Sequence, residues 1–136
     1  MGKIERIGVS LEKKLLADFD KIISGQGYKN RSEAIRDLIR EKISKKQLAD
    51  PNTLAVAGVF LIYDHHKTKL TQKLIELQHN HLLEVAASTH VHLDHHNCLE
   101  VIILKGKVKE IENLGNKISS LKGVKLSRVN LMASGL

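Results

Sequence analysis

The single proline divides this chain. Pro51 lies in the segment LADPNT (48–53), where Asp-Pro-Asn is typical of a turn, and a proline ends the helical pattern that precedes it. The 136 residues are therefore predicted to form two modules, residues 1–50 and 51–136. A module of about 50 residues buries too little surface to be stable alone. The first module is thus expected to need a partner.

The first module is predicted to be one short strand followed by two helices. Apolar and polar side chains alternate in residues 5–11, which is the period of a strand. Apolar side chains at helical spacing follow in residues 12–24 and again in 30–43, where Asn30 and Glu33 resemble a capping box. A lone strand is unstable in water, so two copies are expected to pair their strands and share one core of four helices.

The second module has the predicted order β-α-β-β-α-β. The predicted strands are 53–64, 85–93, 98–104 and 124–132, and the predicted helices are 67–84 and 108–121. This order is ferredoxin-like, also called ACT-like: an α+β domain with a four-stranded antiparallel sheet and both helices on one face. The bare face of such a sheet is expected to be covered by further oligomerisation.

All eight histidines lie within residues 65–96, and the segment THVHLDHHNC (89–98) also contains the only cysteine. His90 and His92 are two residues apart on a predicted strand, so both project from the same face. The turn that follows brings Cys98 beside them. Two imidazoles and one thiol predict a metal site, tetrahedral for Zn²⁺ or square-planar for Ni²⁺ or Cu²⁺.

The side chains near this segment have different expected roles. Val91 and Leu93 are expected to point away from the histidines, into the apolar layer. Glu100 shares the face of the thiol and is either a group that orients a ligand or an ordinary surface residue. His79 is a candidate fourth ligand from the preceding helix, whereas His81 faces elsewhere. The histidines interpreted as solvated surface residues are His65, His66, His95 and His96, with weak binding of extra metal as the alternative for His65 and His66.

The charge and hydropathy of the chain indicate which partners and which compartment to expect. Lys and Arg number 22 against 15 Asp and Glu, a formal net charge of +7 that favours polyanionic partners such as nucleic acid. A single cysteine excludes an internal disulfide and suits a reducing compartment. The longest apolar run, residues 54–63, is too short to cross a bilayer, and the N-terminus lacks the apolar core of a signal peptide. A cytoplasmic protein without membrane contact is expected.

Two stretches of the chain resemble a known family. RIGVSL…GYKNRSEAIRDLIR resembles a ribbon-helix-helix DNA-binding module, and QHNH…HVHLDHHNCLEVIILKG resembles the metal-binding core of the nickel-responsive regulator (NikR) family. The resemblance covers nearly the whole chain. It implies one square-planar Ni(II) per chain, held by His90, His92 and Cys98 of one subunit and His79 of a neighbour. It also implies a homotetramer built as a dimer of dimers.

The same resemblance assigns the DNA contacts. A two-stranded ribbon fits the major groove, and its outward positions are Arg6, Gly8 and Ser10. Gly8 stands where the family often has Thr, and without a side chain it does not read a base. Asn30 and Arg31 begin the second helix, where free backbone N–H groups favour phosphate. The expected partner is a double-stranded operator with an inverted repeat.

A second cation site, filled by K⁺, is also implied by the family. Its carboxylates match Glu33 and Asp37, which lie four residues apart on one helix face; from the residues alone they are solvated acids paired with neighbouring arginines. Lys67 matches a residue that touches the DNA backbone. The next position, commonly basic in the family, is Thr68 here, which weakens the expected contact.

These features together predict a nickel-sensing transcriptional regulator that represses nickel uptake and is not an enzyme. The main alternative is a zinc-type metalloenzyme in which His90, His92 and Cys98 leave an open metal position for water. That alternative leaves the first module unexplained. A third possibility, a DNA-binding regulator that senses a small molecule, leaves the histidines and the cysteine unexplained.

Overall fold

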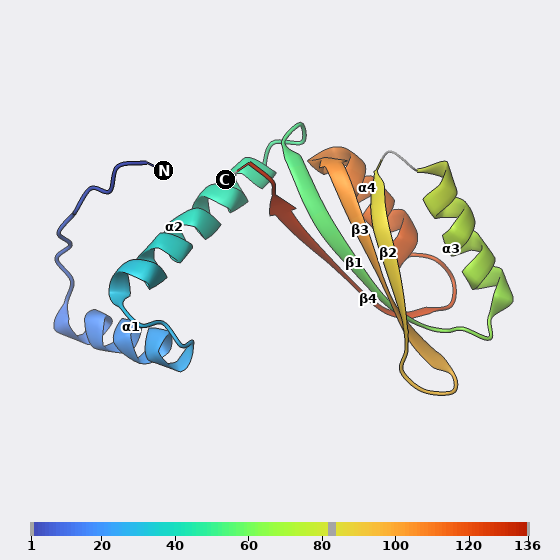
Figure 1. Ribbon diagram of the computed structural model, residues 1–136, viewed down its shortest axis with the longest axis horizontal. Helices are drawn as coiled ribbons and strands as arrows, with labels where there is room; N and C mark the ends of the chain where they lie inside the picture. The colour runs from blue at the N-terminus through green and yellow to red at the C-terminus, as the bar shows by residue number, and fades with distance from the viewer. Residues whose placement is uncertain (1, 82–83, 136) are drawn as a thin grey trace. The chain divides into compact units, whose positions relative to one another are not determined.

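The computed structural model describes residues 2–81 and 84–135 (Figure 1). The chain divides into two compact units, Met1–Glu41 and Lys42–Leu136, which are called the first and the second unit below. Helix α2 (Arg31–Leu48) crosses this division. The predicted helix 67–84 extends over residues 82 and 83, which lie outside the described residues. None of the helices described is long and apolar enough to cross a membrane.

The first unit contains helix α1 (Lys13–Gly25) and the first turns of α2, as the sequence predicted. Gly27, with φ at +83°, allows the tight turn between the helices. The side-chain oxygen of Asn30 accepts a hydrogen bond from the Glu33 amide at 3.0 Å, so Asn30 caps α2. Residues 2–12 form no strand in the single chain, because a strand needs a hydrogen-bonded neighbour.

Apolar burial in the first unit is sparse. Among its described residues, Ile23 and Ala34 are the buried hydrophobic ones. The large apolar side chains that remain exposed are Ile4, Ile7, Val9, Leu11, Leu15, Ile22, Leu38 and Ile39. Two helices alone therefore enclose almost no core, as the small size of this module led us to expect.

The second unit is a four-stranded antiparallel sheet with two helices (Figure 1). Its strands are β1 (Leu54–Asp64), β2 (Val85–His92), β3 (Asn97–Lys107) and β4 (Val124–Ala133), and its helices are α3 (Thr68–Asn80) and α4 (Val108–Ser119). The strand order is β2-β3-β1-β4, which confirms the ferredoxin-like arrangement and the α+β class. Strands β3 and β1 are central, whereas β2 and β4 lie at the edges.

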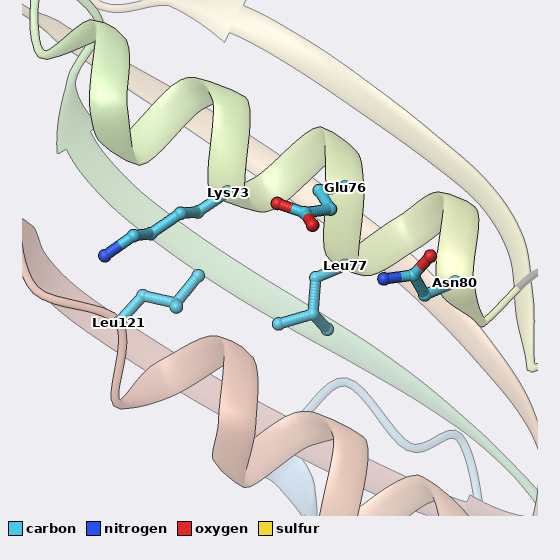
Figure 2. Close-up of a pocket in the computed structure, with 5 residues that line it drawn as sticks. All are labelled: Lys73, Glu76, Leu77, Asn80 and Leu121. Carbon is cyan, nitrogen blue, oxygen red and sulfur yellow. The ribbon is translucent and has the colours of Figure 1, made fainter.

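Both helices pack on the same face of this sheet. Every second residue of β1, from Ala55 to Tyr63, is buried on that face. Leu74 of α3 and Ile111 of α4 join them in one aliphatic core. A small cavity of about 160 Å³ opens between α3 and the end of α4 (Figure 2). Its lining residues are Lys73, Glu76, Leu77, Asn80 and Leu121.

The other face of the sheet is apolar and uncovered in the single chain. Phe60 of β1, Ile103 of β3 and Met132 of β4 are exposed. Val91 and Leu93 are also exposed, by 44% and 50%. The expectation that these two side chains point into the buried apolar layer is therefore wrong: in the hairpin register, the histidines face the helix-covered side.

Candidate metal centre and DNA-binding surface

The β2–β3 hairpin positions the predicted metal donors. His92 pairs with Cys98 across the ladder and His90 pairs with Glu100, and directly opposed residues project from the same face. The ring centroids of His90 and His92 lie 5.2 Å apart. The structure thus confirms that both imidazoles and the thiol share one face, the face that the helices cover.

The thiol lies deepest of these donors. Cys98 is fully buried, and its Sγ donates to the carbonyl oxygen of Tyr63 at 3.5 Å. Burial raises the pKa of the Cys98 thiol above its usual value, because a buried thiolate loses its hydration. The thiol therefore keeps its proton at neutral pH, and metal binding must release that proton.

The two imidazoles are exposed, since β2 is an edge strand. The ligating atoms of His90, His92 and Cys98 do not all lie within 4.8 Å of one another in the single chain. The side chains of His90 and His92 can rotate, because no packing restricts them on the solvent side. Such a rotation would bring the three donors together.

Glu100 is a buried carboxylate and not an ordinary surface residue. It is 7% exposed, accepts a hydrogen bond from the Tyr63 hydroxyl at 2.9 Å and another from the Gln78 amide at 3.0 Å. Burial, followed by the charge of Glu100, raises the pKa of Tyr63, which stays a neutral donor. Glu100 thus connects the donor-bearing strand β3 to helix α3.

Sequence reasoning did not identify the two partners of Glu100. Tyr63 lies on the buried face of β1, but the continuous apolar run of this strand does not show in sequence which face is buried. Gln78 could not be identified from the sequence either, because the tertiary structure decides which part of α3 meets the edge of the sheet.

The structure does not bring His79 to the hairpin. It is exposed on α3, directly after Gln78, and one residue along a helix turns a side chain by about 100°. Gln78 reaches Glu100, so His79 points away from the donors of its own chain. His81 lies 3.8 Å from Glu84 and also faces elsewhere, as expected.

Among the described residues, one group of three has metal-ligating atoms that all lie within 4.8 Å of one another: Asp64, His66 and His96. The Nδ1 of His66 is 3.2 Å from Oδ1 of Asp64, and the rings of His66 and His96 are 5.5 Å apart. Sequence reasoning favoured solvent for both histidines, kept weak binding of extra metal as an alternative for His66, and did not single out Asp64. No sequence pattern indicates this group, since the end of β1 meets the hairpin turn only in the tertiary structure.

His65 lies between the two groups of histidines. Its ring centroid is 4.2 Å from that of His66 and 5.1 Å from that of His92. Its Nδ1 is buried and has no hydrogen-bond partner among the residues that the structure describes. Burial is the main cause that lowers the pKa of His65, so the ring is neutral at pH 7 and carries a free lone pair.

The predicted DNA-contacting residues lie on an exposed segment and on a helix start. Arg6, Gly8 and Ser10 are all exposed. Arg31, however, forms a fork with the Asp20 carboxylate, with both nitrogen–oxygen distances at 2.8 Å. This hydrogen-bonded pair lowers the pKa of Asp20. A phosphate at the start of α2 would therefore compete with Asp20 for Arg31.

The carboxylates assigned to the second cation site already have partners. Asp37 accepts a hydrogen bond from the Tyr28 hydroxyl at 2.7 Å and lies 3.4 Å from Arg40. Glu33 is exposed one turn earlier. In the second unit, Lys67 lines a cavity of about 450 Å³ at the start of α3. Three further lysines line it: Lys69, Lys73 and Lys122.

Comparison with known proteins decides the family. A family model described as the NikR C terminal nickel binding domain matches residues 56–132, more than half of the chain. The chain belongs to the nickel-responsive regulator family. A second model, described as a ribbon-helix-helix protein of the copG family, matches residues 5–46.

Relatives along the whole chain agree with this membership, and the three that follow are all provisionally named nickel-responsive regulators. One from Nitratidesulfovibrio vulgaris (strain Miyazaki F) is 44% identical over 99% of this chain and 97% of its own length. One from Chlorobium phaeobacteroides is 49% identical over 92% of each chain. One from Pyrococcus furiosus is 46% identical over 97% of this chain and 96% of its own.

Membership in the nickel-responsive regulator family settles the class of protein. The chain is a transcriptional regulator with a ribbon-helix-helix DNA-binding part and a nickel-binding domain, and it is not an enzyme. The metalloenzyme alternative is therefore wrong. The chemistry of the hairpin fits nickel, because two imidazoles and a buried thiol are donors that Ni(II) accepts.

Proposed function

We propose that this regulator represses nickel-uptake genes when Ni(II) occupies the β2–β3 hairpin, with one ion per chain. The observation that carries the proposal is the ladder register, which sets His90 and His92 on the same face as the thiol of Cys98. His79 of a neighbouring subunit is the fourth ligand in this proposal. Its exposure on α3, away from its own hairpin, supports a role between chains.

The proposed assembly is a homotetramer, a dimer of dimers. Two surfaces support it: the uncovered apolar side chains of the first unit, and the bare sheet face that exposes Phe60, Ile103 and Met132. First units would pair through their N-terminal strands, and second units would cover each other's sheets. We place this assembly in the cytoplasm, where the free thiol of Cys98 stays reduced.

The proposed signal passes through Glu100. This carboxylate joins β3 to Gln78 of α3, and His79 is the next residue of that helix. Bound nickel supplies a link between the hairpin of one chain and α3 of another. Glu100, Tyr63 and Gln78 hold the two elements of each chain in a fixed relation, so order at the hairpin restricts α3. The metal can only favour the arrangement that binds it more tightly.

For DNA binding we propose the division that the sequence suggested: residues 1–50 bind DNA and residues 51–136 bind metal. Arg6 and Ser10 would read base edges of an inverted repeat in the major groove, with Gly8 leaving its position unread. Asn30, Arg31 and Lys67 would contact the DNA backbone, and the exposed lysines beside Lys67 support that role.

We retain Glu33 and Asp37 as the proposed K⁺ site of the DNA-bound form. Their exposed carboxylates support it, since oxygen donors suit a hard cation. Occupation would replace the contact between Asp37 and Arg40. The Tyr28 hydroxyl, which donates to Asp37, would then remain as a group that orients the carboxylate.

A nickel titration of the apoprotein, followed by absorption, tests the metal assignment. We expect one equivalent per chain with a thiolate-to-metal charge-transfer band. The band should disappear in Cys98→Ala and persist in the control His81→Ala, whose histidine lies beside Glu84. Full-strength binding of the first equivalent by Cys98→Ala would overturn the assignment.

A gel-shift assay with DNA from upstream of a nickel-uptake gene tests the rest of the proposal. We expect nickel to tighten binding by about 5–150-fold, the range typical of coupling between two sites. Equal affinity with and without nickel would contradict nickel-dependent repression, even if the charge-transfer band had confirmed the metal ligands.

A further inference from the structure

A second set of metal donors lies at the open end of the sheet, apart from the hairpin donors. We propose that Asp64, His66 and His96 form an exposed site for a divalent first-row transition-metal ion. These three residues are the group, among those described, whose ligating atoms converge within 4.8 Å. The donors proposed for the regulatory ion do not converge so closely in the single chain.

Local hydrogen bonds hold the first two donors in place. Oδ1 of Asp64 accepts a hydrogen bond from the backbone N–H of His66 at 3.0 Å and lies 3.2 Å from its Nδ1. An ion would take the place of this contact, because Nδ1 of His66 and Oδ1 of Asp64 are close enough to bind it side by side, with the proton of the neutral ring on Nε2. The Asp64 carboxylate is then a ligand, and the hydrogen bond from the backbone N–H of His66 keeps it in place.

The third donor sits on a separate loop whose shape is also fixed. Asp94 accepts hydrogen bonds from the backbone N–H of His96 at 2.8 Å and of Asn97 at 2.7 Å. The backbone N–H of His65 donates to the carbonyl of His96 at 3.0 Å, which joins the two loops. The donors therefore come from two tethered segments, and little backbone order remains to be gained on binding.

The donor set defines the class of ion. Two imidazoles and one carboxylate suit Ni²⁺, Cu²⁺, Zn²⁺ and Co²⁺, whereas Ca²⁺ and Mg²⁺ prefer oxygen ligands only. Two exposed imidazoles and one half-buried carboxylate leave the remaining positions to water, so this site should be weaker than one with a buried thiolate. It would be filled second, and without a thiolate band. Its occupation would fasten the loop before α3 to the hairpin turn.

The test uses the full-length protein and Ni²⁺ alone, with binding followed by calorimetry and absorption. We expect a second, weaker equivalent per chain that adds no charge-transfer band. His66→Ala and His96→Ala should each weaken this equivalent at least tenfold and leave the first equivalent with its band. Asp64→Asn should weaken it to a similar extent, because a neutral amide oxygen is a poorer ligand for these ions than a carboxylate.

The matched control is His95→Ala, since His95 is exposed in the same turn but lies outside the converging group. It should retain the second equivalent. Cys98→Ala should also retain it, which separates this inference from the proposed regulatory site. A second equivalent that survives His66→Ala and His96→Ala, or that His95→Ala removes equally, would overturn the proposal. The histidine and aspartate variants replace exposed or half-buried side chains, and circular dichroism checks that every variant is folded.

Discussion

The first unit leaves most of its large apolar side chains in solvent, whereas the second unit encloses an aliphatic core on one face of its sheet. In the second unit the buried cluster runs from Ala55 on β1 to Ile118 on α4. In the first unit, Ile23 and Ala34 are the buried hydrophobic residues among those described, while Leu38 is 54% exposed. One unit thus forms a core within the chain, and the other forms almost none.

The proposed metal-binding residues and the proposed base-contacting residues differ in the same way. The metal donors lie on a hairpin whose register is already formed in one chain. Arg6 and Ser10 belong to a segment that forms no strand in the single chain. In the proposed assembly, metal binding can therefore begin in the separate subunit, whereas base recognition depends on the pairing of two first units. Substitutions placed in each unit can test this difference.

Removal of a core side chain from the second unit should have the largest effect. Leu61 is fully buried between the sheet and the helices. Leu61→Ala removes apolar contacts and leaves a cavity, which typically costs about 2–5 kcal/mol of unfolding free energy. Urea denaturation followed by circular dichroism measures it. A cost below about 1 kcal/mol, well under that range, would mean that the second unit does not depend on this core.

The corresponding change in the first unit is Leu38→Ala. An exposed leucine would contribute little, within about 0.5 kcal/mol. If the proposed dimer buries Leu38, the cost rises to about 1.5–3 kcal/mol. The thermal midpoint should then also depend on protein concentration, because dissociation accompanies unfolding.

Lys42→Ala, an exposed change on the same helix, serves as the control for Leu38→Ala. It should leave both stability and the concentration dependence unchanged. Equal, small effects of the two substitutions would indicate that the first unit is stable without a partner, and the contrast between the units would fail.

The sequence was sufficient for most of the fold because local patterns determined it. The predicted strand 53–64 and the predicted helix 108–121 match β1 and α4 within one or two residues. The strand order followed from the β-α-β-β-α-β pattern. The face on which Val91 lies could not be predicted, because both faces of this sheet are apolar in sequence and only the helices decide which one is covered.

The candidate site was predictable where its donors are neighbours in sequence. His90, His92 and Cys98 are separated by one hairpin turn, so their spacing was informative. Glu100 was left open between two roles, since its partner Gln78 comes from another element. The group of Asp64, His66 and His96 depends on contact between the end of β1 and a distant turn, which spacing does not reveal.

Coupling between the units gives the next prediction. His79→Ala should leave three donors on one hairpin, so some nickel still binds. It should lose the nickel-dependent gain in operator affinity, about 1–3 kcal/mol, because α3 is no longer linked to a neighbour's hairpin. The measurement is operator affinity with and without nickel, at one salt concentration, for both proteins.

His81→Ala is the control for the coupling experiment, because its ring lies beside Glu84 at the end of the same helix. It should keep the full gain. Salt-dependent, non-specific DNA binding should persist in both variants, since the basic residues of the first unit remain. An unchanged gain in His79→Ala would mean that the metal signals through the hairpin alone, and that the second unit needs no neighbour to respond.

The smallest expected effect concerns acid titration, and it compares one carboxylate from each unit. Asp94 in the second unit has a pKa lowered to about 2, first by the side-chain hydrogen bond of Asn97 and then by backbone N–H groups. Asp20 in the first unit has a pKa lowered by Arg31, an exposed cation. Both groups titrate below the ordinary value of 3.8.

The direction of the pH effect is the same for the two carboxylates. Because each folded pKa lies below the unfolded value, its stabilisation is complete above pH 3.8 and is lost as the pH falls through the folded pKa. For Asp94 this window extends down to about pH 2. Acid should therefore weaken the Asp94 turn only as the pH approaches about 2.

Salt should separate the two carboxylates, because their partners differ in charge. High salt screens the charge of Arg31 and should move the pKa of Asp20 toward 3.8. The N–H donors of Asp94 are neutral and are not screened, and the charge of His96 is the smallest of the causes, so the pKa of Asp94 should move less than that of Asp20. Carboxyl chemical shifts measured by NMR follow both groups at once. The two salt concentrations are about 0.05 M and 0.5 M, which lie below and above the ionic strength at which screening extends about 8–10 Å. Arg31→Ala should remove the salt response of Asp20, and Asn97→Ala should raise the pKa of Asp94 at either salt. Equal salt responses would contradict the view that an exposed charge lowers the pKa of Asp20, whereas hydrogen bonds of the turn mainly lower the pKa of Asp94.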